Sequence, residues 1–157
     1  MIRSIVYDEL PECLSVIQNS HMPITEQFGI TRENFPQATA FIEFNKLLEY
    51  WNDGYHMYGY FLSGEMVGYV SLDDLGDGNF EMCHLSVLPQ YRQAGYGLAL
   101  VDFCKVTARN LGGKKLKLSF ISENERLKAW YLQQSFVFTG VKDYGLVFTP
   151  GYMEYNL

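Results

Sequence analysis

A strand-like run, a pair of glycines and a helical pattern follow one another in the middle of the 157-residue chain. Residues 81–87 have the spacing of a strand, and residues 98–111 repeat apolar side chains at helical spacing. Between them, Gly95 and Gly97 leave bare backbone N–H groups at the start of the helix. Such donors, together with the positive end of a helix, bind phosphate groups. The stretch therefore predicts a phosphate-binding strand–loop–helix unit.

A further strand follows this helix, because residues 115–121 alternate apolar and polar side chains. A strand, a helix and a strand in this order predict two parallel strands joined by a right-handed crossover. Upstream, residues 55–62 and 65–72 flank the turn Ser63-Gly64 and predict an antiparallel meander with residues 80–87.

The rest of the chain supplies helices and strands to one domain over residues 1–157. We expect a strand at 2–7, a helix capped by Asp8, and an irregular polar segment over 20–36. A second helix carries Phe41, Phe44, Leu48 and Trp51 on one face and stops at residues 52–54. The helix after Gly97 buries Leu98, Val101, Cys104, Ala108 and Leu111. Ser122 and Glu125 form a capping box for the next helix, and strands at 136–141 and 151–157 complete the sheet.

Three phosphate-binding motifs compete for the glycine pair. The dinucleotide motif G-x-G-x-x-G requires a third glycine where Leu100 stands, and the P-loop requires a Gly-Lys-Ser/Thr that does not follow. The remaining pattern is Arg-x-x-Gly-x-Gly, formed by Arg92, Gly95 and Gly97. A tight turn before an ordinary helix is the alternative interpretation.

The Arg-x-x-Gly-x-Gly pattern resembles the pyrophosphate loop of the GNAT superfamily, the acetyl-CoA-dependent N-acetyltransferases. Residues 81–89 are similar to the family strand that enters this loop, and Asn124 with Tyr131 resembles its second motif. Residues 148–153 resemble the last strand of a bacterial subgroup whose substrate is unknown. The resemblance covers most of residues 55–157, and Ser135 departs from the glycine that usually closes the second motif.

The resemblance implies an α/β (α+β) fold with a mixed, mostly antiparallel sheet of about seven strands and helices on both faces. It also implies that the strands at 81–87 and 115–121 splay apart and that acetyl-CoA lies in the gap. The oxyanion donors and the pantetheine partners would be backbone groups of residues 85–87. The residues expected to bind the cofactor are Leu85, Ser86, Val87, Arg92, Gln93, Ala94, Gly95, Tyr96, Gly97, Leu98 and Asn124.

Acetyl transfer to an amine needs a proton acceptor, because neutralising an amine of pKa near 10.4 at pH 7 costs about 4–5 kcal/mol. Glu81 is the candidate base, and a solvated strand-end glutamate is the alternative. Strand alternation predicts that Glu81, Cys83, Leu85 and Val87 share one face and that His84 lies on the other.

Tyr131 resembles the general acid of the family. A tyrosine is a weaker acid than a thiol, so we expect Tyr131 to stabilise the leaving sulfur by hydrogen bonding at least as much as by protonation. The alternative is a core aromatic residue beside Leu127 and Trp130. Asn124 lies seven residues earlier on the same helical face, where it could hold an amide of the cofactor.

Composition excludes several other classes of protein. A net charge of −6 argues against nucleic-acid binding and favours a cationic acceptor. No run reaches the roughly 18 apolar residues of a membrane span, and no signal peptide is evident. Three cysteines without C-x-x-C spacing indicate reduced thiols in the cytoplasm, and the spacing of the three histidines predicts no metal site.

The expected activity is N-acetyl transfer from acetyl-CoA to a primary amine of a small molecule or peptide, by direct attack on the thioester. A non-catalytic acyl-CoA-binding sensor of the same fold is the alternative, and a longer acyl donor is a third possibility. We expect residues 20–36, the second helix and the last two strands to wall the acceptor pocket, with Glu26, Glu33 or Tyr144 near the acceptor. A homodimer is the commonest homo-oligomer.

Overall fold

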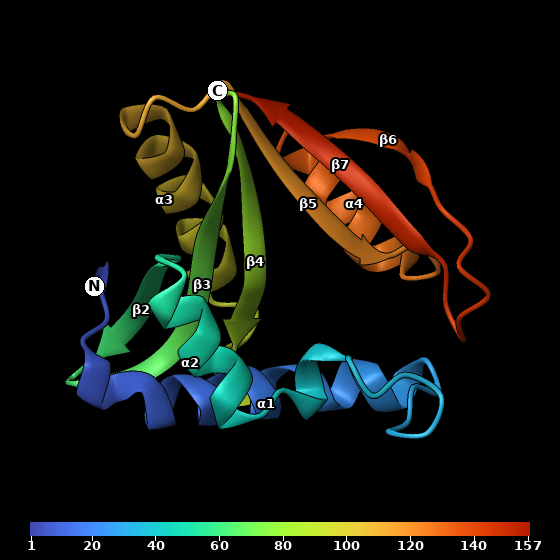
Figure 1. Ribbon diagram of the computed structural model, residues 1–157, viewed down its shortest axis with the longest axis horizontal. Helices are drawn as coiled ribbons and strands as arrows, with labels where there is room; N and C mark the ends of the chain where they lie inside the picture. The colour runs from blue at the N-terminus through green and yellow to red at the C-terminus, as the bar shows by residue number, and fades with distance from the viewer.

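Seven strands form a single sheet in the order β1-β2-β3-β4-β5-β7-β6 in the computed structural model, which describes residues 1–157 (Figure 1). Only the β4–β5 pair is parallel. This confirms the mixed, mostly antiparallel sheet. The strands are β1 (Ile2–Ser4), β2 (His56–Leu62), β3 (Glu65–Gly76), β4 (Asn79–Val87), β5 (Lys115–Ile121), β6 (Val137–Val141) and β7 (Pro150–Asn156).

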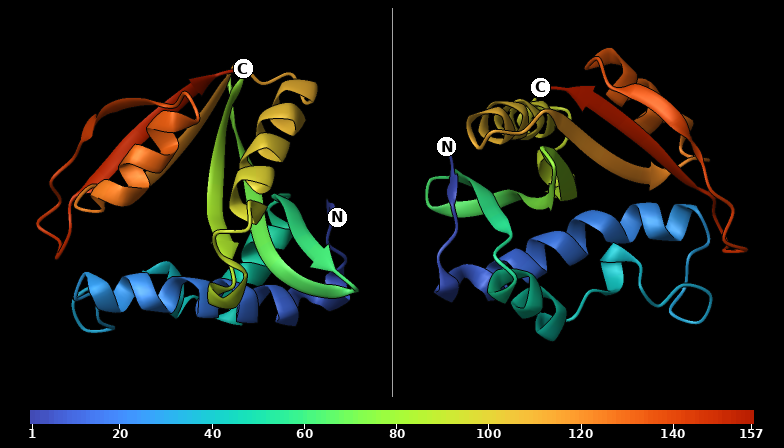
Figure 2. Two further views of the ribbon diagram at one scale, coloured as in Figure 1. Left: turned by 180° about the vertical axis from the view of Figure 1, so that it is seen from behind. Right: turned by 45° about the horizontal axis from the view of Figure 1, so that its top comes forward.

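Four α-helices and three short 3-10 turns complete the chain. The helices are α1 (Leu10–Gln27), α2 (Phe44–Asn52), α3 (Tyr96–Asn110) and α4 (Glu125–Gln133). The 3-10 turns are η1 (Tyr7–Glu9), η2 (Thr39–Phe41) and η3 (Pro89–Tyr91). Helices α1 and α2 cover one face of the β1–β4 part of the sheet, and α3 covers the other face (Figures 1 and 2).

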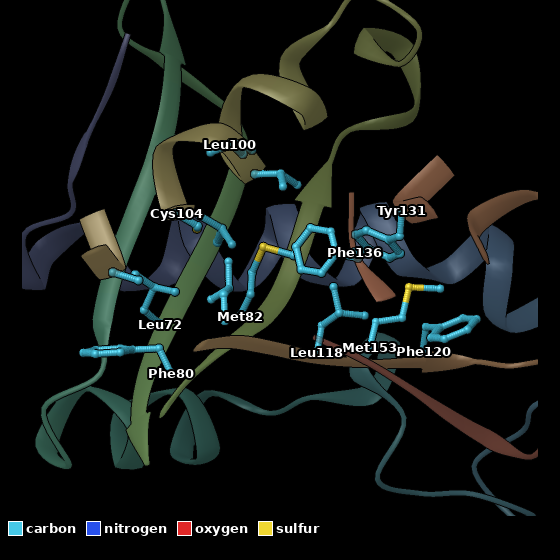
Figure 3. Close-up of a cluster of buried hydrophobic side chains, with 14 of the residues drawn as sticks. Leu72, Phe80, Met82, Leu100, Cys104, Leu118, Phe120, Tyr131, Phe136 and Met153 are labelled. Atoms are coloured by element: carbon cyan, nitrogen blue, oxygen red, sulfur yellow. The ribbon is translucent and has the colours of Figure 1, made fainter. Parts of the chain in front are cut away.

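Two apolar cores correspond to these two faces. The larger core joins α3 to β3, β4 and β5 and continues to Tyr131 of α4 and Met153 of β7 (Figure 3). The smaller core packs α1 and Leu47 of α2 against β2 and β3. Because the larger core runs under β4 and β5 alike, it holds the two halves of the sheet together on one side.

Strands β4 and β5 are paired only at their beginnings. Residues 79–81 pair with residues 115–117, and beyond this point the strands diverge (Figures 1 and 2). Strand β5 instead pairs with β7 along its whole length. The splay implied by the family resemblance is therefore present, and from Met82 onward β4 lacks a strand neighbour on this side.

A β-bulge interrupts β4 just after the strands part. Tyr69 pairs with Ser86 and Ser71 with Cys83, so two residues of β4 oppose one residue of β3. His84, one of these two, has a positive φ of 56°. The extra residue reverses the alternation of side chains for the rest of the strand.

The predicted faces of β4 are consequently wrong beyond Cys83. Leu85 and Val87 pack with the larger core instead of sharing a face with Glu81. The His84 ring lies against Tyr50 of α2, with the ring centroids 5.3 Å apart. Burial is the main cause that raises the pKa of Tyr50, and the nearby charge of Glu81 adds to it, so His84 and Glu81 face the same side.

Helix α1 continues to Gln27, although an irregular segment was expected from residue 20. Pro23 inside the helix has no N–H and crowds the preceding turn. Side chains donate to two carbonyl groups in the turn before Pro23. Arg92 donates to the Ser20 carbonyl, and the Thr25 hydroxyl donates to the His21 carbonyl at 2.7 Å. One tertiary contact, from Arg92, and one local contact, from Thr25, thus support the helix that the local sequence disfavours.

Three smaller expectations are also wrong. Asp8 lies within η1 and caps nothing, since Glu9 accepts the Val6 N–H instead. Leu98 and Leu111 are 44% and 46% exposed, so the buried stripe of α3 is formed by Leu100, Val101, Cys104 and Ala108. Asn124, not Ser122, caps α4 by accepting the Leu127 N–H at 3.2 Å.

Candidate functional site

The divergence of β4 and β5 opens a cleft of about 1890 Å³. Its lining comes from β4, the loop before α3, α4, β5, the end of α1 and the segment before β7. Pockets for one small ligand typically hold about 300–1,000 Å³. The cleft is therefore large enough for two reactants side by side.

One end of the cleft is formed by the loop between η3 and α3. Gly95 is the N-cap of α3 and has φ of 87°, and Gln93 has φ of 63°. A β-carbon on Gly95 would meet no atom within 4 Å, so glycine is needed there for the backbone conformation. A β-carbon on Gly97 would touch Trp130 at 3.6 Å, which is an ordinary contact. The open helix start faces the cleft, as an anion-binding loop requires.

The Arg92 side chain lies behind this loop and bridges two elements. Its guanidinium donates to the Ser20 carbonyl of α1 and, at 3.4 Å, to the Val87 carbonyl at the end of β4. Burial lowers its pKa, but a guanidinium remains charged at neutral pH. Arg92 therefore anchors the loop to α1 and adds positive charge beneath it.

The cleft is also lined by Gln93, Tyr96, Gly97 and Leu98, whereas Ala94 is an exposed residue of the loop outside the lining.

The free edge of β4 lies next to the loop. Leu85 and Val87 line the cleft, whereas the side chain of Ser86 is buried on the opposite side. The Ser86 hydroxyl donates to the His84 carbonyl at 2.7 Å. Backbone groups of this edge are placed to hydrogen-bond an extended ligand, because β5 has already diverged.

A half-buried histidine that the sequence did not single out supports this edge. The Nε2 atom of His21, on α1, lies 3.0 Å from the Leu85 carbonyl oxygen and 3.1 Å from the Ser86 hydroxyl. Burial lowers the pKa of His21 to about 4, so the ring is neutral at pH 7 and donates from Nε2 to the carbonyl. No local pattern could reveal this residue, because its partners lie 64 and 65 residues away.

Glu81 lies where β4 and β5 part. It pairs with Lys117 on β5 and with Asp73 on β3, and it lines the cleft. Burial and the charge of Asp73 raise the pKa of Glu81, while Lys117 opposes them. The ammonium of Lys117 lies 3.7 Å from Glu154. A carboxylate of raised pKa is a better proton acceptor than an exposed one.

Tyr131 belongs to the larger core, as the core-aromatic alternative predicts (Figure 3), and it also lines the cleft. Its ring packs between Trp130 and Phe136, with centroids 5.1 and 5.5 Å away, and 6% of the residue is exposed. Burial is the main cause that raises its pKa.

Asn124 is buried at the start of the same helix and lines the cleft, with its Oδ1 engaged in the helix cap.

The other end of the cleft is rich in aromatic side chains. Tyr144 and Tyr152 have their hydroxyl groups 3.4 Å apart, and the rings of Phe35 and Phe148 meet edge to face at 5.1 Å. This end lies between the residues after α1 and the last strands, where the acceptor pocket is predicted. Tyr144 lines it, whereas Glu26 and Glu33 are exposed and lie outside the lining.

Two further properties of the chain concern metal binding and membrane crossing. No group of three or more histidine, cysteine, aspartate and glutamate side chains is arranged to hold a metal ion. None of the helices combines the length and the apolar character needed to cross a bilayer.

A model of the acetyltransferase (GNAT) family matches residues 18–136, which is more than half of the chain. Comparison with curated proteins gives no significant match.

Solved structures share the fold over nearly the whole chain. The ribosomal-protein-S18-alanine N-acetyltransferase from Escherichia coli is 16% identical with a TM-score of 0.78, over 99% of this chain and 92% of that one. The paiA N-acetyltransferase from Thermoplasma acidophilum, in complex with coenzyme A, is 17% identical with a TM-score of 0.77, over 100% and 98%. The yncA protein from Salmonella typhimurium, with its cofactor acetyl-CoA, is 16% identical with a TM-score of 0.74, over 100% and 93%. At these identities, the likeness establishes the shared fold alone.

Proposed function

The chain belongs to the GNAT family of acetyltransferases, which use acetyl-CoA, and from this premise we propose that it acetylates a primary amine by direct attack of the amine on the thioester. One observation carries the proposal. A single cleft is lined by the loop at the start of α3, the free edge of β4, Glu81 and Tyr131. The loop and the strand edge can anchor the acetyl donor, Glu81 can accept a proton, and Tyr131 can stabilise a leaving thiolate.

The cofactor would lie along the free edge of β4. Its pyrophosphate would accept hydrogen bonds from the N–H groups at residues 93–98, above the charge of Arg92. Its pantetheine arm would pair with the backbone of residues 85–87, and Asn124 would supply an amide donor from the opposite side. The positive φ of Gly95 and the open space around it fit a closely approaching anion.

The amine must lose a proton before its lone pair can attack the thioester carbon. Glu81 would accept this proton, either directly or through a water molecule. A new carbon–nitrogen bond then forms, and the carbonyl oxygen gains a negative charge. N–H groups at the free edge of β4 would stabilise this oxyanion, with each donor contributing about 3–4 kcal/mol.

The carbon–sulfur bond then breaks and the thiolate leaves. The hydroxyl of Tyr131 would donate a hydrogen bond to the sulfur. Because burial raises the pKa of Tyr131 above that of an ordinary tyrosine, full proton transfer to a thiolate is unfavourable. Stabilisation by a hydrogen bond is therefore the main contribution that we assign to this residue.

A covalent acetyl-enzyme is disfavoured by the state of the cysteines. Cys13, Cys83 and Cys104 are free thiols, and burial raises the pKa of all three. Cys83 lines the cleft, but it stays protonated at neutral pH and is a poor nucleophile. This supports direct transfer from cofactor to amine.

The acceptor would be an amine of a small molecule or a peptide. The similar Escherichia coli structure is named for acetylation of a ribosomal protein, and the Thermoplasma acidophilum structure is named an N-acetyltransferase without a stated acceptor. Both names are compatible with an amine acceptor for this chain.

Calorimetric titration with acetyl-CoA, followed by turnover with a panel of amines, tests the proposal. Gly97→Asp is the informative variant, because an aspartate suits a helix N-terminus but repels a pyrophosphate. Gly97→Ala is its matched control, since the added carbon makes only ordinary contacts. We expect binding to be lost in Gly97→Asp and retained in Gly97→Ala. Binding without transfer to any amine would favour a non-catalytic acyl-CoA sensor.

A further inference from the structure

The charges that line the cleft are unevenly distributed. Glu81 is the only carboxylate in the lining, and the only arginines are Arg92 and Arg126. Arg92 lies under the loop before α3, and Arg126 is in the first turn of α4. Arg92 therefore belongs to the end proposed for the cofactor, and Arg126 lies two residues from Asn124, which is proposed to contact the cofactor. The aromatic end of the cleft contains no lysine or arginine.

Cations near the aromatic end are outside its lining or already engaged. Lys117, the neighbour of Glu81 on β5, is paired with Glu154 at 3.7 Å. Lys142 lies over the ring of Tyr144 at 4.9 Å and does not line the cleft. Asp73, opposite Glu81 on β3, adds a second negative charge nearby. Glu81 and Asp73 thus place two negative charges at this end, and the lining itself offers no cation there to receive an anion.

The remaining lining of this end is mainly aromatic, and it carries no further carboxylate. Tyr50 and Tyr55 stack with centroids 4.6 Å apart, and Leu146 lies in the segment before β7. The aromatic residues that line it are Phe35, Tyr50, Tyr55, Tyr144, Phe148 and Tyr152. Such a surface binds an apolar or aromatic body and attracts a cation to the faces of the rings.

We infer that the acceptor is a primary amine with an apolar, aromatic-sized body and no carboxylate on the carbon that bears the amine. This inference rests on the proposed acetyl transfer. In a free amino acid the carboxylate is attached to the same carbon as the amine, so an amine beside Glu81 would bring that carboxylate close to Glu81 as well. Like charges repel there, and no cation compensates.

Matched acceptors that differ only in this group test the inference. With acetyl-CoA as donor, kcat/KM is measured for phenethylamine, phenylalaninamide and phenylalanine. We expect the first two to exceed phenylalanine by at least about tenfold, the scale of an uncompensated like-charge contact. A comparison of the peptide Phe-Gly-Gly with phenethylamine shows whether the enzyme prefers a peptide amino terminus or a small free amine as its acceptor. Phenylalanine used as well as phenethylamine would overturn the inference.

A charge variant provides a second, independent readout. Tyr144→Arg places a cation beside Tyr152, and Tyr144→Gln is its uncharged control. We expect Tyr144→Arg, compared with Tyr144→Gln, to improve phenylalanine relative to phenethylamine by several-fold. An unchanged ratio would contradict the inference.

A wider set of acceptors separates the preference for an apolar amine from acetyl transfer itself. Spermidine, lysine and glucosamine 6-phosphate are assayed beside the apolar amines. Transfer to these polar amines but not to the apolar ones would overturn the inference and leave acetyl transfer intact. Transfer to none, by a protein that binds acetyl-CoA, would overturn both.

Discussion

The imidazole Nε2 of His21 lies 3.0 Å from the backbone carbonyl oxygen of Leu85. This contact joins α1 to the bulged segment of β4, whose free edge is proposed to hold the thioester. The bulge alone does not determine where these backbone groups point. A neutral histidine, kept neutral by burial, supplies the donor that holds them.

His21 is therefore predicted to act as a positioning residue. Replacing it by leucine leaves the Leu85 carbonyl without its donor, which costs about 1–3 kcal/mol. We expect His21→Leu to lower kcat/KM for acetyl-CoA by about tenfold or more, and His21→Gln, which keeps an N–H donor, to retain most of it. Thermal unfolding of both variants is the control. Equal losses in the two variants would assign His21 a packing role only.

Stability should depend on pH through His84. Burial lowers its folded-state pKa from 6.5 to about 4, and its Nδ1 is buried without a partner. Between these two values the unfolded chain takes up a proton that the folded chain refuses, so stability is lost as pH falls from 6.5 to 4. The loss attributable to this residue is about 3 kcal/mol.

Chemical denaturation at pH 7 and pH 4.5 checks this prediction. His84→Asn removes the titrating group, and asparagine tolerates the positive φ at this position. The variant should lose less stability than the wild type over this range. Identical losses would show that His84 is protonated in the folded protein as easily as in the unfolded chain.

Glu81→Gln should remove the proton acceptor while preserving the shape of the cleft. We expect kcat/KM to fall by about 10²–10⁴-fold, with little change in the Kd of acetyl-CoA. In the wild type, activity should decline as pH falls through the pKa of Glu81, which burial raises above its usual value. A variant that keeps both the activity and the acidic limb of the pH–rate profile would exclude Glu81 as the base.

Tyr131→Phe should separate chemistry from packing. The ring keeps its contacts with Trp130 and Phe136, so the Tm should stay near that of the wild type. Loss of the hydroxyl should lower kcat by about 10²–10⁴-fold and leave acetyl-CoA binding unchanged. A kcat within a factor of two of the wild type would remove Tyr131 from the proposed role.

The order of elements could be predicted because its signals are local. The glycine loop, the alternation of residues 115–121 and the turn at Ser63-Gly64 each specify structure over a few residues, and the structure has each of them. The bulge at His84 could not be predicted, because the apolar alternation of Cys83, Leu85 and Val87 continues across it. The bulge is defined only by the pairing with β3, whose partner residues lie more than ten residues away.

The same distinction applies to the site. Glu81, the loop before α3 and Tyr131 lie in segments with local patterns, and all of them line one cleft. His21 and the length of α1 escaped prediction because Pro23 disfavours a helix locally, while a distant arginine and the β4 edge support it. The aromatic residues that line the aromatic end of the cleft come from the segment after α1, from α2 and the residue before β2, and from β7 and the segment before it, which only the fold brings together.

The short seam between β4 and β5 has a mechanical consequence. Three residue pairs join the two halves of the sheet, so the seam is the pivot about which one half would rotate against the other. Displacement grows with distance from a pivot. Glu81, within the seam, would stay nearly still, while the end of β4 and the start of α3 would travel furthest from the half that carries Tyr131. The angle between the two halves of the sheet at this three-residue seam thus sets the width of the gap across which the acetyl group is transferred.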